Sequence, residues 1–147
     1  MRVALLALAL MVSAPVAAQE VASRAGLEGF VTLDRLPVPD QPLLAEGRVI
    51  WGETCENCHG GNKPTGAPKI TSTKAWEPRI AQGFDVLLPH AIEGFLGPRY
   101  TQMPARGGNP DLSDAEVTLA VAFMVWASGG EVEAARFLED FRKGVTQ

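Results

Sequence analysis

Cysteine and histidine are scarce in this chain of 147 residues, which contains two of each. A zinc site needs about four ligands, usually with a second pair of cysteines or histidines. Both cysteines and one histidine lie within residues 55–59, so His90 is the one further candidate ligand. Basic residues number 13 against 17 acidic ones, and the formal net charge of −4 argues against binding to nucleic acid or anionic lipid.

The chain also lacks an apolar stretch of about 20 residues, the length that a membrane-spanning helix requires. Its N-terminus instead has the features of a secretory signal peptide, which we predict over residues 1–18. Arg2 gives a positive start, an apolar run spans residues 3–12, and residues 16–18 (Val-Ala-Ala) are typical of a cleavage site. An uncleaved anchor is the alternative. Cleavage would remove Arg2 and make the mature chain one charge more negative.

Residues 55–59 read Cys-Glu-Asn-Cys-His, the C-x-x-C-H pattern of c-type haem attachment. With two intervening residues, one helical turn can present both thiols to the two vinyl groups of one haem. We therefore predict that Cys55 and Cys58 attach one haem c per chain, and that His59 is the proximal ligand to its iron. Bacterial haem attachment takes place outside the cytoplasmic membrane, so the motif and the leader together predict a periplasmic protein.

Three other interpretations of the motif compete with haem attachment. A thioredoxin-like redox pair formed by Cys55 and Cys58 would be expected in a βαβ context, and the sequence has no strand pattern there. A zinc site lacks ligands, as described above. A chance match in a structural segment requires three uncommon residues in register. Haem attachment is favoured over all three.

The second axial ligand has two candidates. Of the four methionines, two leave with the leader, and Met124 lies in a strongly apolar segment where core packing explains it. Met103 lies in the polar, glycine-rich loop 97–110 and is followed by Pro104, so it has no obvious packing role. We favour Met103 as the ligand opposite His59. A second imidazole, from His90, is the alternative.

Apolar periodicity predicts five helices, and in the first of them Gly47 suits close approach by another helix. The fourth is the best defined, because Ser113 and Glu116 form a capping box and Gly129 follows its end. It is apolar on all sides, so a terminal extension or a partner protein must cover part of it. The predicted ranges are 43–54, 72–81, 85–94, 112–128 and 131–143, the last with Val132, Ala135, Leu138 and either Phe137 or Phe141 facing inward.

Two further expectations concern the surroundings of His59. A backbone carbonyl from loop 60–71 is needed to accept the second ring N–H of His59. The carbonyl of Pro68 is one candidate, and the alternative, that Pro68 is an ordinary turn proline without this role, is equally favoured. Trp76 and Arg79 lie three residues apart in the second helix, where each can donate to a haem propionate. A surface arginine packed over an aromatic ring is an equally common arrangement.

The ordered motifs within residues 43–128 resemble a class I cytochrome c, and most closely the short bacterial cytochrome c5-like branch. The resemblance implies an all-α fold of about four to five helices around one covalent haem, with the first and last core helices crossing near Gly47 and Phe123. It implies His59 and Met103 as axial ligands, and a histidine at the position of His90 that does not bind iron. The matching stretches are Gly47-x-x-x-Trp51, CENCH at 55–59, GAPKI at 66–70, WEPRIAQG at 76–83 and MPARGGNPDLSDAEVTLAVAFM at 103–124.

We accordingly divide the chain into a signal peptide (1–18), an extended N-terminal segment (19–42), a cytochrome c domain (43–129) and a C-terminal helical extension (130–147). The resemblance implies one-electron transfer between redox protein partners by low-spin His/Met-ligated iron, without enzymatic activity. Membrane contact is expected only through a partner complex. The alternatives are a fixed haem subunit of a larger dehydrogenase or oxidase and, less favoured, a haem peroxidase or gas-binding protein with an open sixth site.

Overall fold

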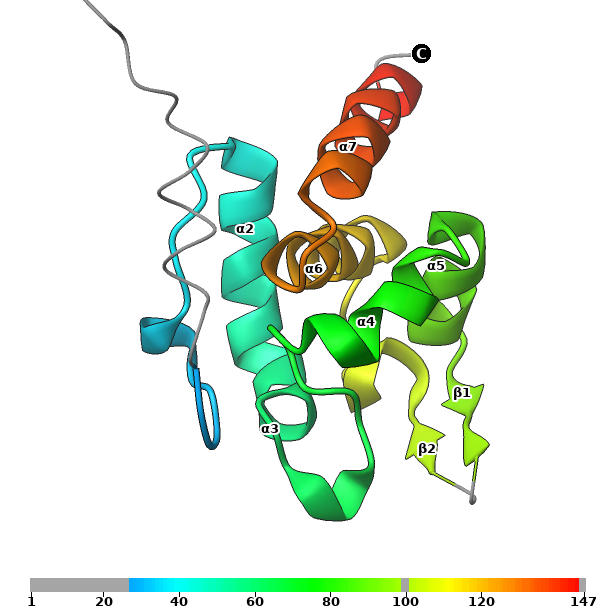
Figure 1. The fold of residues 1–147 in the computed structure, drawn as a ribbon. Coiled ribbons are helices and arrows are strands. Elements are labelled where there is room, and N and C mark those ends of the chain that lie inside the picture. Colours follow the sequence, from blue (N-terminus) through cyan, green and yellow to red (C-terminus); the bar gives the residue numbers. More distant parts are fainter. Residues whose placement is uncertain (1–26, 99–100, 146–147) are drawn as a thin grey trace, which may run out of the picture.

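The computed structural model describes residues 27–98 and 101–145, which form helices and one short hairpin (Figure 1). The predicted signal peptide, residues 1–18, lies outside the described residues. The predicted all-α class is confirmed. In chain order the elements are η1 (Leu33–Arg35), α2 (Pro42–Ile50), η2 (Trp51–Cys55), α3 (Glu56–His59), η3 (Lys63–Thr65), α4 (Thr73–Ile80), α5 (Phe84–Ile92), β1 (Phe95–Leu96), β2 (Gln102–Met103), η5 (Ala105–Gly108), α6 (Asp114–Ala127) and α7 (Glu131–Val145).

The first core helix is a continuous rod made of α2, η2 and α3. Pro42 occupies its first turn, where the missing N–H has no cost. Instead of ending at Thr54 as predicted, the rod runs through η2, a π-helical turn in which the Glu56 N–H donates to the Trp51 carbonyl. The extra residue of a π-turn rotates everything after it by about 100° relative to an uninterrupted α-helix. The turn therefore sets the direction in which residues 55–59 face.

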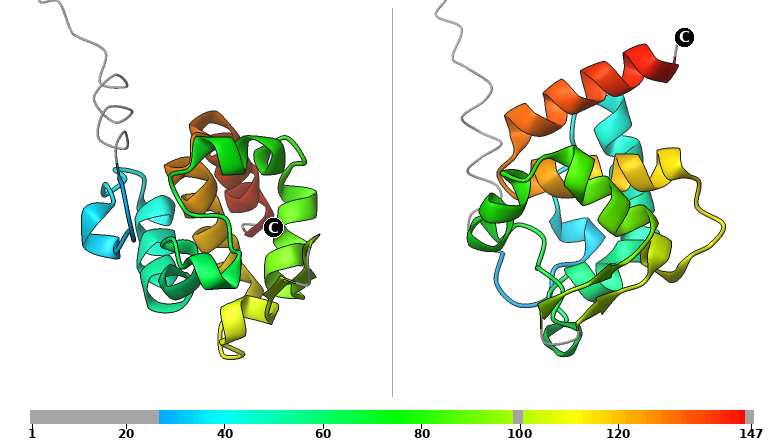
Figure 2. Two further views of the ribbon diagram at one scale, coloured as in Figure 1. Left: turned by 60° about the horizontal axis from the view of Figure 1, so that its bottom comes forward. Right: turned by 90° about the vertical axis from the view of Figure 1, so that its right-hand side faces the viewer.

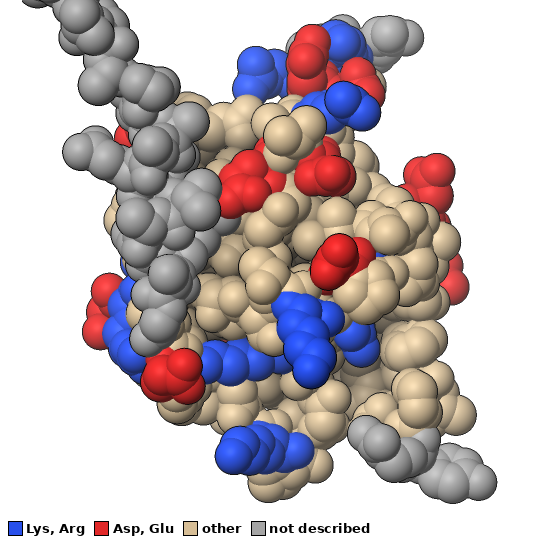
Figure 3. All heavy atoms as spheres, viewed as in Figure 1, with Lys and Arg blue, Asp and Glu red and all other residues tan. Residues whose placement is uncertain are grey.

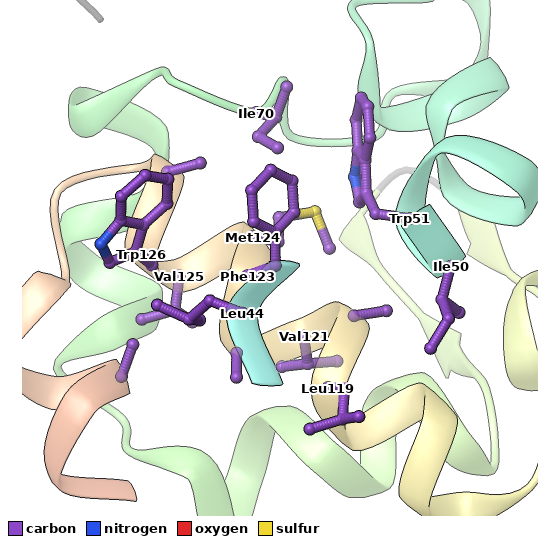
Figure 4. Packing of buried hydrophobic residues seen from close by; sticks show 14 of the residues in the cluster. Leu44, Ile50, Trp51, Ile70, Leu119, Val121, Phe123, Met124, Val125 and Trp126 are labelled. Atoms are coloured by element: carbon purple, nitrogen blue, oxygen red, sulfur yellow. The ribbon is translucent and has the colours of Figure 1, made fainter. Parts of the chain in front are cut away.

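The rod crosses α6 at Gly47, where the two backbones touch. A Cβ at position 47 would collide with the Leu119 carbonyl oxygen and lie 2.5 Å from the carbonyl carbon. The crossing is thus at Leu119 and Ala120, one turn before the Phe123 that the family resemblance implied. Phe123 instead packs against Trp51, with ring centroids 6.2 Å apart and planes inclined by 60° (Figure 4).

Helix α6 is the centre of the hydrophobic core. Its N-terminus has the predicted capping box, in which the Glu116 N–H donates to Ser113 Oγ and the Ser113 N–H donates to the Glu116 carboxylate. Every residue from 117 to 127 is buried, among neighbours that include α2, α5 and α7 (Figure 4). Gly129 follows the helix at φ 105°, and the Gly130 N–H donates to the Val125 carbonyl, 3.0 Å away. No helix within 27–98 and 101–145 has the length and apolarity to span a bilayer.

Helix α7 lies along α6 and covers the side that the other helices leave open (Figure 2). Its inward face differs from the prediction, because Val132 is 65% exposed and Ala135 is exposed too. Ala134 and Leu138 are fully buried, and the Phe137 ring stacks on Phe84 of α5 with centroids 3.9 Å apart. Leu138 and Phe137 thus face inward as predicted, whereas Ala134 is buried in place of Val132 and Ala135. The C-terminal extension provides the cover for α6 from within the chain.

The contact at Gly47 can be tested with a Gly47→Ala variant. We expect it to lower the free energy of unfolding by about 2–3 kcal/mol or more, because the added methyl group forces two packed backbones apart. Urea unfolding followed by circular dichroism measures the change. Gly144→Ala in α7 is the matched control: no atom lies within 4 Å of its Cβ, so only helix propensity acts, with a gain of at most about 1 kcal/mol. Equal effects of both variants would contradict the proposed contact.

Candidate functional site

The two cysteines lie one helical turn apart at the end of the rod, Cys55 at the end of η2 and Cys58 in α3. Both are half-buried free thiols. Burial raises the pKa of the Cys55 thiol to about 12, and the neighbouring Cys58 raises it further in the same direction. Redox-active cysteines have a lowered pKa that yields the reactive thiolate. The environment of Cys55 therefore argues against a thioredoxin-like redox pair.

His59 ends α3 and is 6% exposed. Its Nδ1 lies 2.9 Å from the Pro68 carbonyl oxygen, which can only accept, so Nδ1 carries the proton and donates it. The predicted role of Pro68 is thereby confirmed. Burial lowers the pKa of His59, the Pro68 carbonyl opposes this, and the Arg79 charge lowers the pKa further. The ring is thus neutral, with the lone pair of Nε2 available to a metal ion.

Trp76 of α4 packs beside His59, with ring centroids 6.3 Å apart. Its indole N–H donates to the Lys69 carbonyl at 2.9 Å, so this single donor is already used within the protein. This bond competes with the haem-propionate contact that the sequence suggested for Trp76, so the structure does not support that contact. Arg79 donates through Nη1 to the Ala75 carbonyl and keeps further N–H groups, so its propionate contact stays a prediction.

A small apolar cavity lies between Cys55 of the attachment turn and α6. Met103 of β2 lines the cavity, as do Cys55 and four residues of α6 at helical spacing. Its internal volume is about 20 Å³, roughly the space of one water molecule, so its walls must move apart to admit a larger group. The complete lining is Cys55, Ala91, Met103, Arg106, Gly107, Leu112, Val117, Ala120, Val121 and Met124.

The η5 turn closes one end of this cavity against η2. Arg106 and Gly107 have left-handed backbone conformations, φ 53° and 66°. Arg106 is held by an ion pair to Asp114, 2.6 Å long, and donates to the Leu112 carbonyl at 2.9 Å. A Cβ at position 107 would lie 2.9 Å from the Thr54 methyl group, so only glycine allows η5 to approach η2 this closely.

Among the candidate ligands, His90 is not part of the cavity wall. Its ring stacks on Phe95 with centroids 4.1 Å apart, while its neighbour Ala91 lines the cavity. Met124, interpreted from the sequence as a core residue, is 3% exposed and also lines the cavity. The α6 residues that line the cavity recur at the i, i+3, i+4, i+7 spacing of one helix face, which could have marked them in the sequence as cavity-lining. The pattern was not visible because apolar residues occupy every face of α6.

The residues present fit a c-type haem by the chemistry of their donor atoms. Cys55 and Cys58 offer two thiols on one turn, His59 offers an imidazole nitrogen, and Met103 offers a thioether sulfur on a cavity wall. The buried Trp51 Nε1 has no hydrogen-bond partner among the described residues, and Trp51 lies in η2, the turn that ends at Cys55. The described residues contain no group of three or more His, Cys, Asp or Glu suited to a metal ion, which removes the support for a zinc site.

Comparison with known proteins finds one matching family model and several similar proteins. A family model described as "Cytochrome C oxidase, cbb3-type, subunit III" matches residues 42–124. The chain is 43% identical over 84 residues to cytochrome c-555 of Chlorobaculum thiosulfatiphilum, a match covering 57% of this chain and 95% of that protein. It is 44% identical over 84 residues to cytochrome c-555 of Chlorobaculum tepidum, covering 57% and 76% of the two chains. Cytochrome c5 of Ectopseudomonas mendocina is 39% identical over 77 residues, 51% of this chain and 82% of that protein.

The approach of η5 to the attachment turn predicts the effect of Gly107→Ala. We expect it to lower the free energy of unfolding by about 1 kcal/mol more than Gly108→Ala, which has similar left-handed strain but no atom closer than 3.7 Å. Thr54→Ser removes the opposing methyl group and should restore most of that difference in the Gly107→Ala background. Urea unfolding measures all the variants, and no rescue by Thr54→Ser would contradict the contact.

Proposed function

Since the chain belongs to the cytochrome c family, as a small class I member, we propose that it is a periplasmic monohaem cytochrome that passes single electrons between redox protein partners. It is an electron-transfer protein with covalently bound haem c, and not an enzyme. The observation that carries the proposal is the C-x-x-C-H turn at the end of the rod, beside a cavity also lined by Met103. One haem per chain follows from the two cysteines.

Four side chains are proposed to hold the haem. Cys55 and Cys58 each supply one sulfur for covalent attachment. His59 supplies Nε2, and its ring orientation is fixed because Nδ1–H donates to the Pro68 carbonyl. Met103 would hold the iron through its thioether sulfur. When bound, the haem iron supplies a reversible one-electron change between its ferric and ferrous states.

The surrounding chain supports electron transfer by keeping the site dry and rigid. The α6 face lining the cavity is apolar, and His59 is almost entirely buried. With His59 and Met103 both holding the iron, the site would offer no position to a substrate. A thioether ligand and a dry pocket both raise the reduction potential. A site that does not rearrange when its charge changes also lowers the reorganisation cost of each transfer.

The distribution of charge favours an acidic partner surface. Residues 57–76 contain three lysines (63, 69 and 74) and no acidic residue, although the whole chain is net negative. In Figure 3 basic side chains gather in the lower middle of the face, over the stretch that joins α3 to α4. Complementary charge increases the rate at which transient partners meet. We therefore expect association with a redox partner to slow as the salt concentration rises.

The proposed organisation of the chain follows the sequence analysis. We propose that residues 1–18 are a cleaved export signal and that residues 43–129 form the cytochrome c domain. Residues 19–42 and 130–147 are then extensions of this domain. Val31 and Leu36 in the first extension and Leu138 in the second are buried, so both extensions contribute to the folded unit.

A fixed subunit of a larger oxidase is the second candidate function. It is favoured by the description of the matching family model, which names a subunit of a cbb3-type cytochrome c oxidase. Size-exclusion chromatography of the mature protein, alone and with membrane extract, separates the two candidates. A carrier elutes as a small protein under both conditions, whereas a subunit co-elutes with a large complex.

The role of Met103 can be tested against the second methionine of the cavity wall. We expect Met103→Leu to retain covalent haem, to lose the weak Fe–S charge-transfer band near the red end of the ferric spectrum, and to lower the reduction potential. Met124→Leu is the matched control and should keep the band. A parental spectrum and potential in Met103→Leu would show that Met103 is not a ligand, and loss of low-spin character in His90→Ala would support two imidazole ligands instead.

Covalent attachment can be tested at the cysteines. We expect the double variant Cys55→Ala/Cys58→Ala to carry no haem through a denaturing gel, because no thiol remains in the chain. Each single variant should retain one thioether bond and a shifted optical spectrum. Haem staining of the gel is the measurement, with the parental chain as the positive control. A colourless parental protein from a host with a working maturation system would contradict the proposed function as a whole.

A further inference from the structure

An N-terminal strap, residues 27–36, lies against the turn that carries the proposed attachment cysteines (Figure 1). The Val31 N–H donates to the Gly60 carbonyl at 2.7 Å, and the Leu33 N–H donates to Glu56 Oε2 at 2.6 Å. Glu56 is the first residue between the two cysteines, and Gly60 follows His59 directly. The strap is therefore bonded at both ends of the attachment turn.

Packing between the strap and the turn is as close as the hydrogen bonds. Val31 is fully buried and Leu36 is 3% exposed. A Cβ on Gly60 would lie 2.7 Å from the Phe30 ring, and a Cβ on Gly52 would lie 2.6 Å from the Leu33 side chain. Glycines therefore lie in the rod and directly after it, where the strap passes closest.

Two basic side chains of the domain hold the strap backbone. Arg48 of α2 donates through Nη2 to the carbonyls of Leu33 and Leu36, at 2.6 and 3.2 Å. Lys69 donates through Nζ to the Leu27 carbonyl at 2.5 Å. Together with Glu56, they make polar contacts along the length of the strap.

The strap lies outside the segment that the family model matches. That match begins at residue 42, after the strap has ended. The partners of the strap, Arg48, Glu56, Gly60 and Lys69, lie within the matched segment.

We propose that the strap is part of the cofactor site and that Glu56 is a positioning residue, which holds the strap over the attachment turn through Leu33. The closed strap keeps water away from this side of the site and so raises the reduction potential. The inference rests on the proposed haem attachment at Cys55 and Cys58.

The physical reason lies in the polar groups at the C-terminal end of the rod. The Gly60 carbonyl accepts from the Val31 N–H of the strap at 2.7 Å, whereas the neighbouring His59 carbonyl accepts from the Ile70 N–H outside the strap. With the strap open, the Gly60 carbonyl would bind water. A site with less water around it disfavours the state with the higher positive charge, which for the iron is the ferric one. Opening of the strap therefore favours the ferric state and lowers the reduction potential.

A pair of substitutions at Glu56 isolates this contact. Glu56→Gln and Glu56→Ala remove the same negative charge, but the glutamine keeps a side-chain oxygen that can accept from the Leu33 N–H. In the full-length holoprotein we expect the amides of Val31 and Leu33 to exchange hydrogen about two- to tenfold faster in Glu56→Ala than in Glu56→Gln, the range that one lost hydrogen bond implies. We also expect a lower reduction potential in Glu56→Ala than in Glu56→Gln.

Glu53 provides the matched control, because it is exposed one turn earlier on the rod and no hydrogen bond joins it to residues 27–36. Its alanine and glutamine variants should not differ from each other. Equal exchange in the two Glu56 variants would overturn the role of Glu56, and faster exchange with an unchanged potential would overturn the effect on the iron. Failure of haem attachment is a separate result, since it contradicts the proposed function while amide exchange still reports on the strap.

Discussion

The approach of two helix backbones at Gly47 is the constraint on which the rest of the structure depends. Because residue 47 has no side chain, the rod lies directly on the Leu119 carbonyl of α6. This contact places the C-terminal end of the rod, with its two cysteines, beside the α6 face that lines the cavity. The π-turn at residues 51–55 then sets the direction of the attachment turn. The candidate site is thus built from one helix crossing and one local irregularity in the rod.

Features that depend on neighbouring residues could be predicted from the sequence. The capping box of Ser113 and Glu116, the glycine after α6 and the C-x-x-C-H turn all involve groups within four residues of each other. Their geometry is fixed by the backbone of a single turn, so residue type and spacing suffice. The hydrogen bond from His59 to the Pro68 carbonyl could be proposed from the sequence for a related reason, because only a short loop separates the two residues.

Features that depend on distant segments could not be predicted in this way. The inward face of α7 depends on contacts with other helices, such as the stacking of Phe137 on Phe84 of α5. Ala134 is therefore buried, where the sequence of α7 predicted Ala135. The Trp76 N–H is used by the Lys69 carbonyl because the loop before α4 folds back on it. The π-turn leaves no sequence signal, since its residues also suit an α-helix. The strap was predicted only as part of an extended N-terminal segment, because its partners lie 12 to 42 residues away.

The position of α7 has a consequence for how the molecule can assemble with others. A helix that is apolar on every side would, if left partly bare, oblige the protein to dimerise or to join a complex in order to fold stably. Here Ala134 and Leu138 bury that side within the same chain. Residues 117–127 of α6 are thus buried within this chain, and this helix does not itself need a partner to cover it. Any association then has to use the outer surface, where contacts form and dissociate without exposing the interior.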